Sequence, residues 1–228
     1  MKKWIALLLA ALLVLSLTAC SSTPSESKPT DNAADSDTPT DTTAATEAEV
    51  EFETGAVEGQ TYTSDLLKLS LTLDDNWQFL SREEIDQVMG ITSDLVSDEE
   101  IAKSLEDGNS YTDMYATNTA TGATVNLLLQ KVGVSALLLN EKSVLEASEE
   151  SIVAALESMG LSNIRYEIGT MTFAGKEHAC AEITGEINGV TLYEKQVCFI
   201  KGTYIASITA STVDENGAEE ILNQFAAK

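Results

Sequence analysis

The chain has 228 residues, of which 43% are hydrophobic, and 37 acidic against 13 basic side chains give it a net charge of −24. This length suits one folded domain with appendages, and the apolar content is sufficient for a core. The negative charge argues against nucleic acid as a partner, because phosphate-rich ligands require a basic surface. Three cysteines are too few for a small domain held together by disulfides.

The first nineteen residues predict an export signal. Met1-Lys2-Lys3 is a short cationic start, and residues 4–19 form an almost unbroken apolar run. In a helix this run spans roughly 24 Å, which is less than the ~30 Å hydrocarbon core of a membrane. A secretory signal peptide over residues 1–19 therefore fits better than a membrane-spanning helix.

The end of the apolar run, Leu17-Thr18-Ala19-Cys20, resembles the lipobox of bacterial lipoproteins. In proteins with that motif the cysteine thiol receives diacylglycerol, and cleavage makes the lipidated cysteine the new N-terminus. We therefore expect cleavage between Ala19 and Cys20, and anchoring of Cys20 to the extracytoplasmic face of the cell membrane. Two or three acyl chains, such as palmitate, are enough for stable anchoring. The alternative is a plain signal peptide followed by an incidental cysteine.

Residues 21–60 have the composition of a linker. Ser, Thr, Asp, Glu and Ala dominate, all three prolines lie here, and ten acidic residues against Lys28 give a charge of −9. Such a segment cannot bury enough apolar surface to offset the entropy of ordering it. We therefore predict a lipidated cysteine and a disordered acidic tether over residues 20–60, followed by a single domain over residues 61–228.

The first half of the domain predicts short strands and helices. Leucines alternate with polar residues at positions 67–73, which is the period of a half-buried strand. Trp77 and Phe79 follow a turn and suggest a further strand. Two helices are then predicted, at residues 82–89 and 97–105. A hairpin follows, in which strands at residues 112–117 and 123–131 flank Thr121-Gly122.

The second half contains the clearest helix and a meander of strands. The helix is predicted at residues 143–159, with Ser143 as its cap and Gly160 at its end. A last helix starts at Asn216 and carries Ile221, Leu222 and Phe225. Four strands lie between them, at residues 163–173, 176–187, 190–200 and 203–211, joined by Ala-Gly, Asn-Gly and Lys-Gly turns.

Tight turns join only antiparallel neighbours, so the chain predicts an α+β fold with a mostly antiparallel sheet of about six or seven strands, flanked by helices. Three stretches then resemble a known family: Leu69-x-Leu71 running into Asn76-Trp77, Asp113-Met114-x-Ala116-x-Asn118, and Gly202-x-Tyr204. Together they are similar to the PsbP-like (DcrB-like) superfamily, as found in small exported lipoproteins. The resemblance covers roughly residues 62–225. It implies a PsbP-like architecture and an accessory or binding role, and it transfers no binding residue.

Catalytic and cofactor motifs are absent from the sequence. His178 is the only histidine, and no Gly-x-Ser-x-Gly, Walker or dinucleotide motif occurs. His178 is therefore interpreted as a half-exposed strand residue, and we expect no catalytic residue, no metal and no cofactor. His178, Cys180 and Cys198 would form a metal site only if they shared one face of the sheet.

The two cysteines of the domain leave two alternatives. A two-residue Asn188-Gly189 turn places Cys180 opposite Val197. The apolar residues of the following strand change phase, and a one-residue bulge at residues 194–196 would place Cys180 opposite Cys198, close enough for a disulfide. If helices cover both faces of the sheet, no bulge is needed and both thiols are buried and free.

Acidity is the remaining candidate signal for a ligand. The domain carries 27 acidic and 10 basic residues, a charge of −17, with carboxylates clustered at residues 98–100, 149–150 and 214–215. Such clusters attract calcium or cationic peptides, but they also occur as solvated groups near helix termini. We expect a lipid-anchored binding or accessory module without catalysis, whose partner is an envelope protein or a cationic ligand. The alternatives are a carboxylate-based envelope hydrolase and an assembly factor in an envelope complex.

Overall fold

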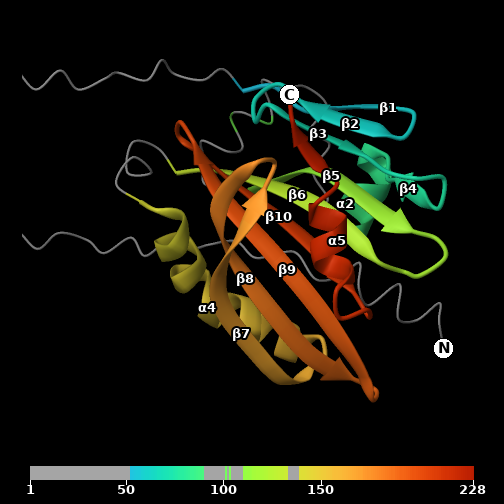
Figure 1. The fold of residues 1–228 in the computed structure, drawn as a ribbon, viewed down its shortest axis with the longest axis vertical. Helices are drawn as coiled ribbons and strands as arrows, with labels where there is room; N and C mark the ends of the chain where they lie inside the picture. Colours follow the sequence, from blue (N-terminus) through green and yellow to red (C-terminus); the bar gives the residue numbers. More distant parts are fainter. Residues whose placement is uncertain (1–51, 90–100, 102, 104–109, 133–138) are drawn as a thin grey trace, which may run out of the picture.

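The computed structural model describes residues 52–89, 101, 103, 110–132 and 139–228 (Figure 1). The described strands form two antiparallel sheets, and the predicted α+β class is confirmed. The smaller sheet has the order β1 (Ala56–Glu58), β2 (Thr61–Ser64), β3 (Leu69–Thr72) and β11 (Phe225–Ala227). The larger sheet has the order β4 (Trp77–Phe79), β5 (Ser110–Asn118), β6 (Thr124–Lys131), β10 (Tyr204–Thr212), β9 (Val190–Lys201), β8 (Lys176–Ile187) and β7 (Ser162–Phe173).

The turns of the meander follow from the residues that occupy them. Ala174-Gly175 and Asn188-Gly189 have positive φ at both positions, namely 46° and 82°, and 52° and 77°. This conformation matches the twist of the two strands that each turn joins. Glycine and asparagine adopt it readily, whereas alanine does so at an energetic cost, so Ala174 is the strained residue of the four. The long strands β7, β8 and β9 are therefore joined by two-residue loops, as predicted.

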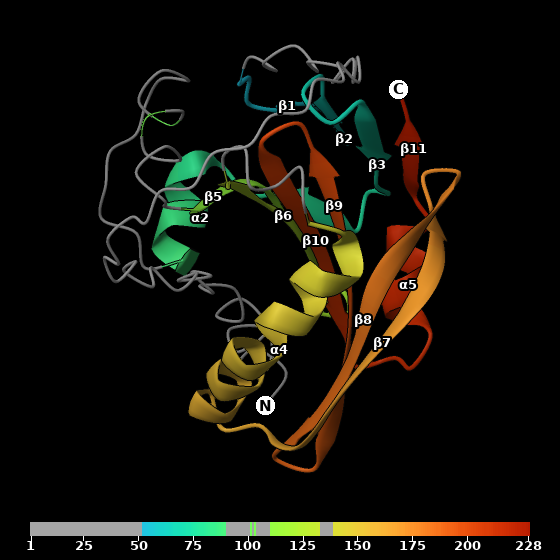
Figure 2. The same ribbon diagram turned by 90° about the vertical axis from the view of Figure 1, so that its left-hand side faces the viewer.

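The larger sheet buries side chains on both faces. Figure 2 shows the helix α4 (Glu141–Ser158) on one face and the short helix α5 (Gly217–Leu222) on the other. Alternate residues of β9 belong to different cores, with Val197 on the α5 side and Cys198 on the α4 side. The smaller sheet contributes Leu71 and Phe225 to the α5-side core, whereas Ile85 of α2 (Arg82–Met89) joins the α4-side core.

The predicted acidic tether needs correction at its C-terminal end. Phe52 is buried, with its ring centroid 6.2 Å from that of Tyr111, and β1 pairs with β2. The backbone N–H of Gly55 donates to the carboxylate of Asp113 in β5. The domain therefore includes residues 52–60. Their composition resembles that of the tether because acidic residues are frequent among them and Phe52 is their only aromatic residue.

The ends of two predicted helices also differ from the structure. The cap of α4 is Asn140 instead of Ser143, because the Asn140 side chain accepts a hydrogen bond from the Ser143 backbone N–H at 2.9 Å. The last helix ends at Leu222, and Phe225 begins strand β11, which pairs with β3. The chain therefore returns to the smaller sheet after α5.

Several predictions fall on residues that the structure does not describe. The signal peptide and Cys20 lie outside the described residues, as does most of the tether. Of the predicted helix at residues 97–105, only Ile101 and Lys103 are described, and both are helical. Within the described ranges, no helix has both the length and the apolar character that crossing a membrane requires.

Candidate functional site

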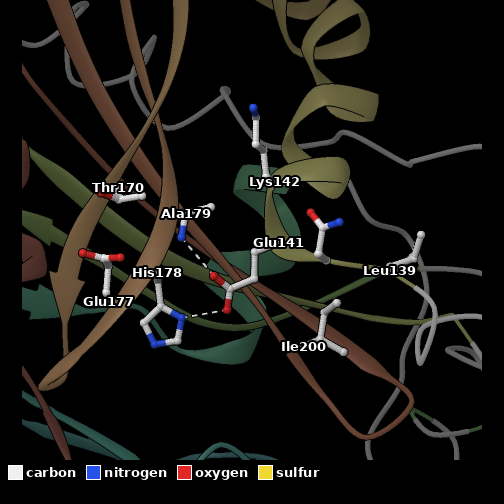
Figure 3. Close-up of a pocket in the computed structure, with 9 residues that line it drawn as sticks. Leu139, Glu141, Lys142, Thr170, Glu177, His178, Ala179 and Ile200 are labelled. Carbon is white, nitrogen blue, oxygen red and sulfur yellow. Dashed lines mark hydrogen bonds and ion pairs between the residues drawn. The ribbon is translucent and has the colours of Figure 1, made fainter.

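An open groove lies where the first turn of α4 meets the beginning of β8 (Figure 3). Its volume is about 480 Å³. Helix α4 contributes its cap and first residues, β7 and β8 form one wall, and β9 contributes a single apolar side chain. The lining residues are Leu139, Asn140, Glu141, Lys142, Thr170, Glu177, His178, Ala179 and Ile200.

The groove exists because β8 separates from β9 at this end of the sheet. The ladder between the two strands ends at the pair Cys180 and Val197, whereas the ladder between β7 and β8 continues to Phe173 and Lys176. The backbone N–H of Ala179 therefore lacks a β9 acceptor. Buried or half-buried amide groups need a partner, so another acceptor has to replace the missing strand.

Glu141, the first residue of α4, supplies that acceptor. One oxygen of its carboxylate accepts from the Ala179 backbone N–H at 2.9 Å, and the other lies 2.8 Å from the Nδ1 atom of His178. Because a carboxylate only accepts hydrogen bonds, Nδ1 carries the proton in this contact. The Glu141 side chain thereby joins the start of α4 to the separated end of β8, and Figure 3 shows both contacts.

The imidazole of His178 is held on its other side by aromatic rings. Its ring centroid lies 6.1 Å from that of Phe173 and 5.7 Å from that of Phe199, and 17% of the side chain is exposed. With Nδ1 bound to Glu141, Nε2 is the ring atom left to meet a ligand. His178 lies in a strand as expected, but its side chain is less exposed than the expected half, and it has an oriented carboxylate partner.

The charges of the groove favour a cationic ligand group. Glu177 and Glu141 both line it, and the single cation in its lining, Lys142, points away from the Glu141 carboxylate in Figure 3. Lys142 instead forms an ion pair with Glu146 at 3.6 Å, one turn further along α4. The accessible groups are therefore carboxylate, imidazole and the Thr170 hydroxyl, which can accept hydrogen bonds from a ligand.

Of the two alternatives for the cysteines, the structure has the free thiols. Cys180 pairs with Val197 and no bulge shifts the register, so Cys180 and Cys198 lie on opposite faces of the sheet. The possible Cys180–Cys198 disulfide is therefore corrected to two buried free cysteines. The phase change of β9 arises because both faces of the sheet are covered, which makes alternate residues apolar on either side.

The cysteines also cannot complete a metal site with His178. Burial raises the pKa of Cys180 and raises the pKa of Cys198 to about 12, which disfavours the thiolate form that binds metals. Among the residues that the structure describes, no three His, Cys, Asp or Glu side chains are grouped closely enough to hold a metal ion.

The acidic clusters lie on the surface where they are described. Glu149 and Glu150 are exposed on α4, and Asp214 and Glu215 are exposed between β10 and α5. The cluster at residues 98–100 lies outside the described residues. None of these clusters lines the groove, so its acidic character comes from Glu141 and Glu177 instead.

One further carboxyl group is buried away from the groove. Glu194 of β9 lies on the α4-side face of the sheet, where Ser211 of β10 donates a hydrogen bond to it at 2.6 Å. Burial raises the pKa of Glu194 to about 7, and the hydrogen bond from Ser211 partly opposes this shift. Other buried polar side chains of neighbouring strands share this face, namely Thr124, Asn126 and Thr209.

Sequence reasoning identified His178 but missed Glu141. The available signal was weak: an acidic residue that directly follows an asparagine at the start of the long helix, which is a common arrangement at helix N-termini. Nothing in the spacing of the two residues shows that they meet. The contact depends on where β8 leaves β9, which is a property of the folded sheet.

Comparison with known proteins gives structural likeness only. No family model matches the chain, and no curated protein matches it. Among solved structures, it is similar to the cyanobacterial PsbP (CyanoP) of Synechocystis sp. PCC 6803, with 8% identity, a TM-score of 0.49, and coverage of 74% of this chain and 92% of that one.

Two further solved structures are similar over smaller parts of the chain. LpqN, described as involved in cell envelope biogenesis of Mycobacterium tuberculosis, is 14% identical with a TM-score of 0.38, over 69% of this chain and 82% of that one. PA94 from Pseudomonas aeruginosa, described as a putative regulator of unknown function, is 10% identical with a TM-score of 0.28, over 49% and 73%. PsbP is the family that the sequence motifs resemble, but TM-scores below 0.5 carry no argument about function.

Proposed function

We propose that this chain is a lipid-anchored, extracytoplasmic binding module without catalysis, and that it binds a cationic group of its partner in the α4–β8 groove. The observation that carries the proposal is the Glu141 carboxylate, which lines an open, acidic groove and is held there by two donors. A carboxylate fixed in this way is ready to receive a cation without reorganisation, which lowers the cost of binding.

The groups in the groove support binding more than catalysis. Its lining contains no serine or cysteine, and its one hydroxyl belongs to Thr170. Thr170 pairs with Ala179, whereas His178 pairs with Met171, so the side chains of Thr170 and His178 leave opposite faces of the β7–β8 pair. A hydrolase that uses a nucleophile needs a hydroxyl or thiol within hydrogen-bond reach of its base. Both oxygens of Glu141 act as acceptors in these contacts, as binding a cation requires, whereas the general acid of a carboxylate-based hydrolase has to donate a proton.

The anchored location is supported by the N-terminal sequence. A cationic start, an apolar run and Leu17-Thr18-Ala19-Cys20 follow one another in the order of a lipoprotein signal. The residues that precede Phe52 then provide the length between Cys20 and the domain. A groove presented in this way would face partners in the cell envelope.

The anchor is tested by detergent-phase partition of the wild-type chain and a Cys20→Ala variant, with the mass of the processed N-terminus measured in parallel. We expect the wild-type chain in the detergent phase, with a mass increase that corresponds to acyl chains on Cys20. We expect the variant in the aqueous phase. Equal partition of both chains, or an unmodified N-terminus, would contradict the anchor.

Binding of a partner in the groove is tested by photo-cross-linking in the native cell. A photo-reactive benzoylphenylalanine replaces one residue of the chain, either Leu139 or Val213. Leu139 lines the groove and is 41% exposed, whereas Val213 follows β10 on another part of the surface and is 42% exposed. We expect a discrete cross-linked product from position 139 and none from position 213. Identical products from both positions, or none from position 139, would contradict binding in the groove.

Catalysis is tested with the same purified chain on panels of esterase, peptidase and glycosidase substrates. We expect no turnover above that of a Glu141→Gln, His178→Ala double variant. Turnover that the double variant abolishes would replace the proposed binding role with an enzymatic one.

A further inference from the structure

Strand β7 forms one edge of the larger sheet and is twelve residues long. On its inner side it pairs with β8 in one register from Phe173 back to Arg165, and an irregularity between Arg165 and Ser162 shifts the register beyond that point. Within the described part of the chain, no strand pairs with its outer side. Figure 2 shows β7 at the margin of the sheet, with α4 lying across the face instead of along the edge. Long edge strands of this kind pair readily with another chain.

The turn between β7 and β8 determines which main-chain groups point outward. Phe173 and Lys176 flank the two-residue turn and form a hydrogen-bonded pair, so odd-numbered residues of β7 direct their N–H and C=O groups toward β8. The N–H and C=O groups of the even-numbered residues therefore point to the outer edge. These residues are Ile164, Tyr166, Ile168, Thr170 and Thr172.

The side chains along the middle of this edge complement one another. Arg165 and Glu167 form an ion pair within the strand and are 71% and 63% exposed. On the opposite face, Ile164, Tyr166 and Ile168 are half-buried against the core on the α4 side. In an antiparallel pair of identical strands, two residues that are two positions apart can face each other across the pair. Opposite charges at these positions attract a second copy of the strand, whereas like charges would repel it.

We propose that the outer edge of β7 pairs antiparallel with the same edge of a second copy, with Tyr166 on the twofold axis. This register places Arg165 opposite Glu167 of the partner subunit, and the reverse, on one face. It places Ile164 opposite Ile168 of the partner subunit on the other. Pairing over residues 164–168 forms about six main-chain hydrogen bonds and joins the two large sheets into one.

Other registers fit less well. Centring the pair on Glu167 or Arg165 brings two like charges together at the axis. Centring it on Ile168 leaves Glu167 opposite Gly169 and Arg165 opposite Met171, and centring it on Ile164 leaves Arg165 opposite Asn163. Only the register on Tyr166 pairs each charge with its opposite, and Asn163, with φ of 54°, ends the regular strand just outside it.

The net charge of −24 opposes association, so the test is performed at about 0.15 M salt, where the Debye length is ~8 Å. The full chain is kept in a non-ionic detergent, and its protein mass is measured by light scattering as a function of concentration. We expect the mass to rise from that of one chain to that of two. A mass of one chain at every concentration up to about 100 µM would overturn the proposal.

Charge reversal tests the register directly. In Arg165→Glu, both charges of the strand are negative, and in Glu167→Arg both are positive, so each variant should dimerise on the order of tenfold more weakly. In an equimolar mixture of the two variants every cross-strand pair is again opposite, so the mixture should regain the dimer. A Glu150→Arg control changes an exposed α4 residue and should leave dimerisation intact.

Each remaining outcome of this experiment bears on the register. If both variants dimerise as well as wild type, the β7 edge is not the interface. If the mixture dimerises as weakly as each variant alone, the proposed pairing of residue 165 with residue 167 of the partner subunit is wrong. Circular dichroism of each variant checks that its fold is intact. We expect an unchanged spectrum because both side chains are exposed and the substitutions leave the main-chain pairing with β8 unchanged.

Discussion

Glu194 couples the stability of the domain to pH. Burial raises its pKa from 4.5 to about 7 in the folded chain. Between these two values the folded state holds a proton that the unfolded state has released, so the free energy of unfolding falls as pH rises, by about 1.4 kcal/mol per pH unit. Over the whole interval of about 2.5 units, the loss amounts to roughly 3 kcal/mol.

A Glu194→Gln variant removes this titration and keeps the size of the side chain. Its carbonyl oxygen can still accept the hydrogen bond that Ser211 donates at 2.6 Å. We expect wild type and variant to have similar free energies of unfolding at pH 4.5, and the variant to be more stable at pH 8 by up to about 3 kcal/mol. The assay is urea unfolding at pH 4.5, 6, 7 and 8, followed by the fluorescence of the buried Trp77.

The difference between the two chains isolates Glu194, because the other carboxyl groups titrate in both. A Glu220→Gln variant is the matched control, since Glu220 is exposed on α5 and its replacement should give a difference that is constant with pH. If the difference for Glu194→Gln stays constant between pH 4.5 and 8, or the variant becomes less stable as pH rises, the reasoning is refuted.

Three further predictions concern contacts that hold the domain together. Glu141→Ala removes the acceptor of the Ala179 N–H, so the free energy of unfolding should fall by about 1–3 kcal/mol and hydrogen exchange of the Ala179 amide should accelerate. An unchanged exchange rate of this amide would contradict the contact. Asp113→Ala should release the segment before β2, which hydrogen exchange of that segment would detect and which full retention of protection would disprove. Cys180 and Cys198 should resist alkylation in the folded chain and both react after unfolding without reductant; a failure to react once unfolded would indicate a disulfide.

The meander was predictable because its turns are local. The predicted strand at residues 176–187 coincides with β8, and the strand at 190–200 ends one residue short of β9. Two-residue turns with asparagine and glycine determine both the strand ends and the direction of the next strand. The position of Cys180 opposite Val197 follows from the same turn, provided that helices cover both faces of the sheet.

The smaller sheet and the groove were not predictable, because each depends on contacts between distant segments. Strands β1 and β11 have three residues each, too few to show a period, and β11 is specified by its pairing with β3. The contact between Glu141 and His178 likewise needs the point at which β8 leaves β9. Local patterns in the sequence do not encode that point.

The pairing of β11 with β3 has a consequence for how the chain reaches its native state. Strand β3 gains its neighbour β11 only when Phe225 can pair with Leu71. The smaller sheet is therefore completed only after almost all of the domain has left the ribosome. Until then β3 has an unoccupied side, which invites aggregation. A chain of this kind benefits from being kept unfolded until synthesis has passed residue 225, as happens when a polypeptide is translocated before it folds.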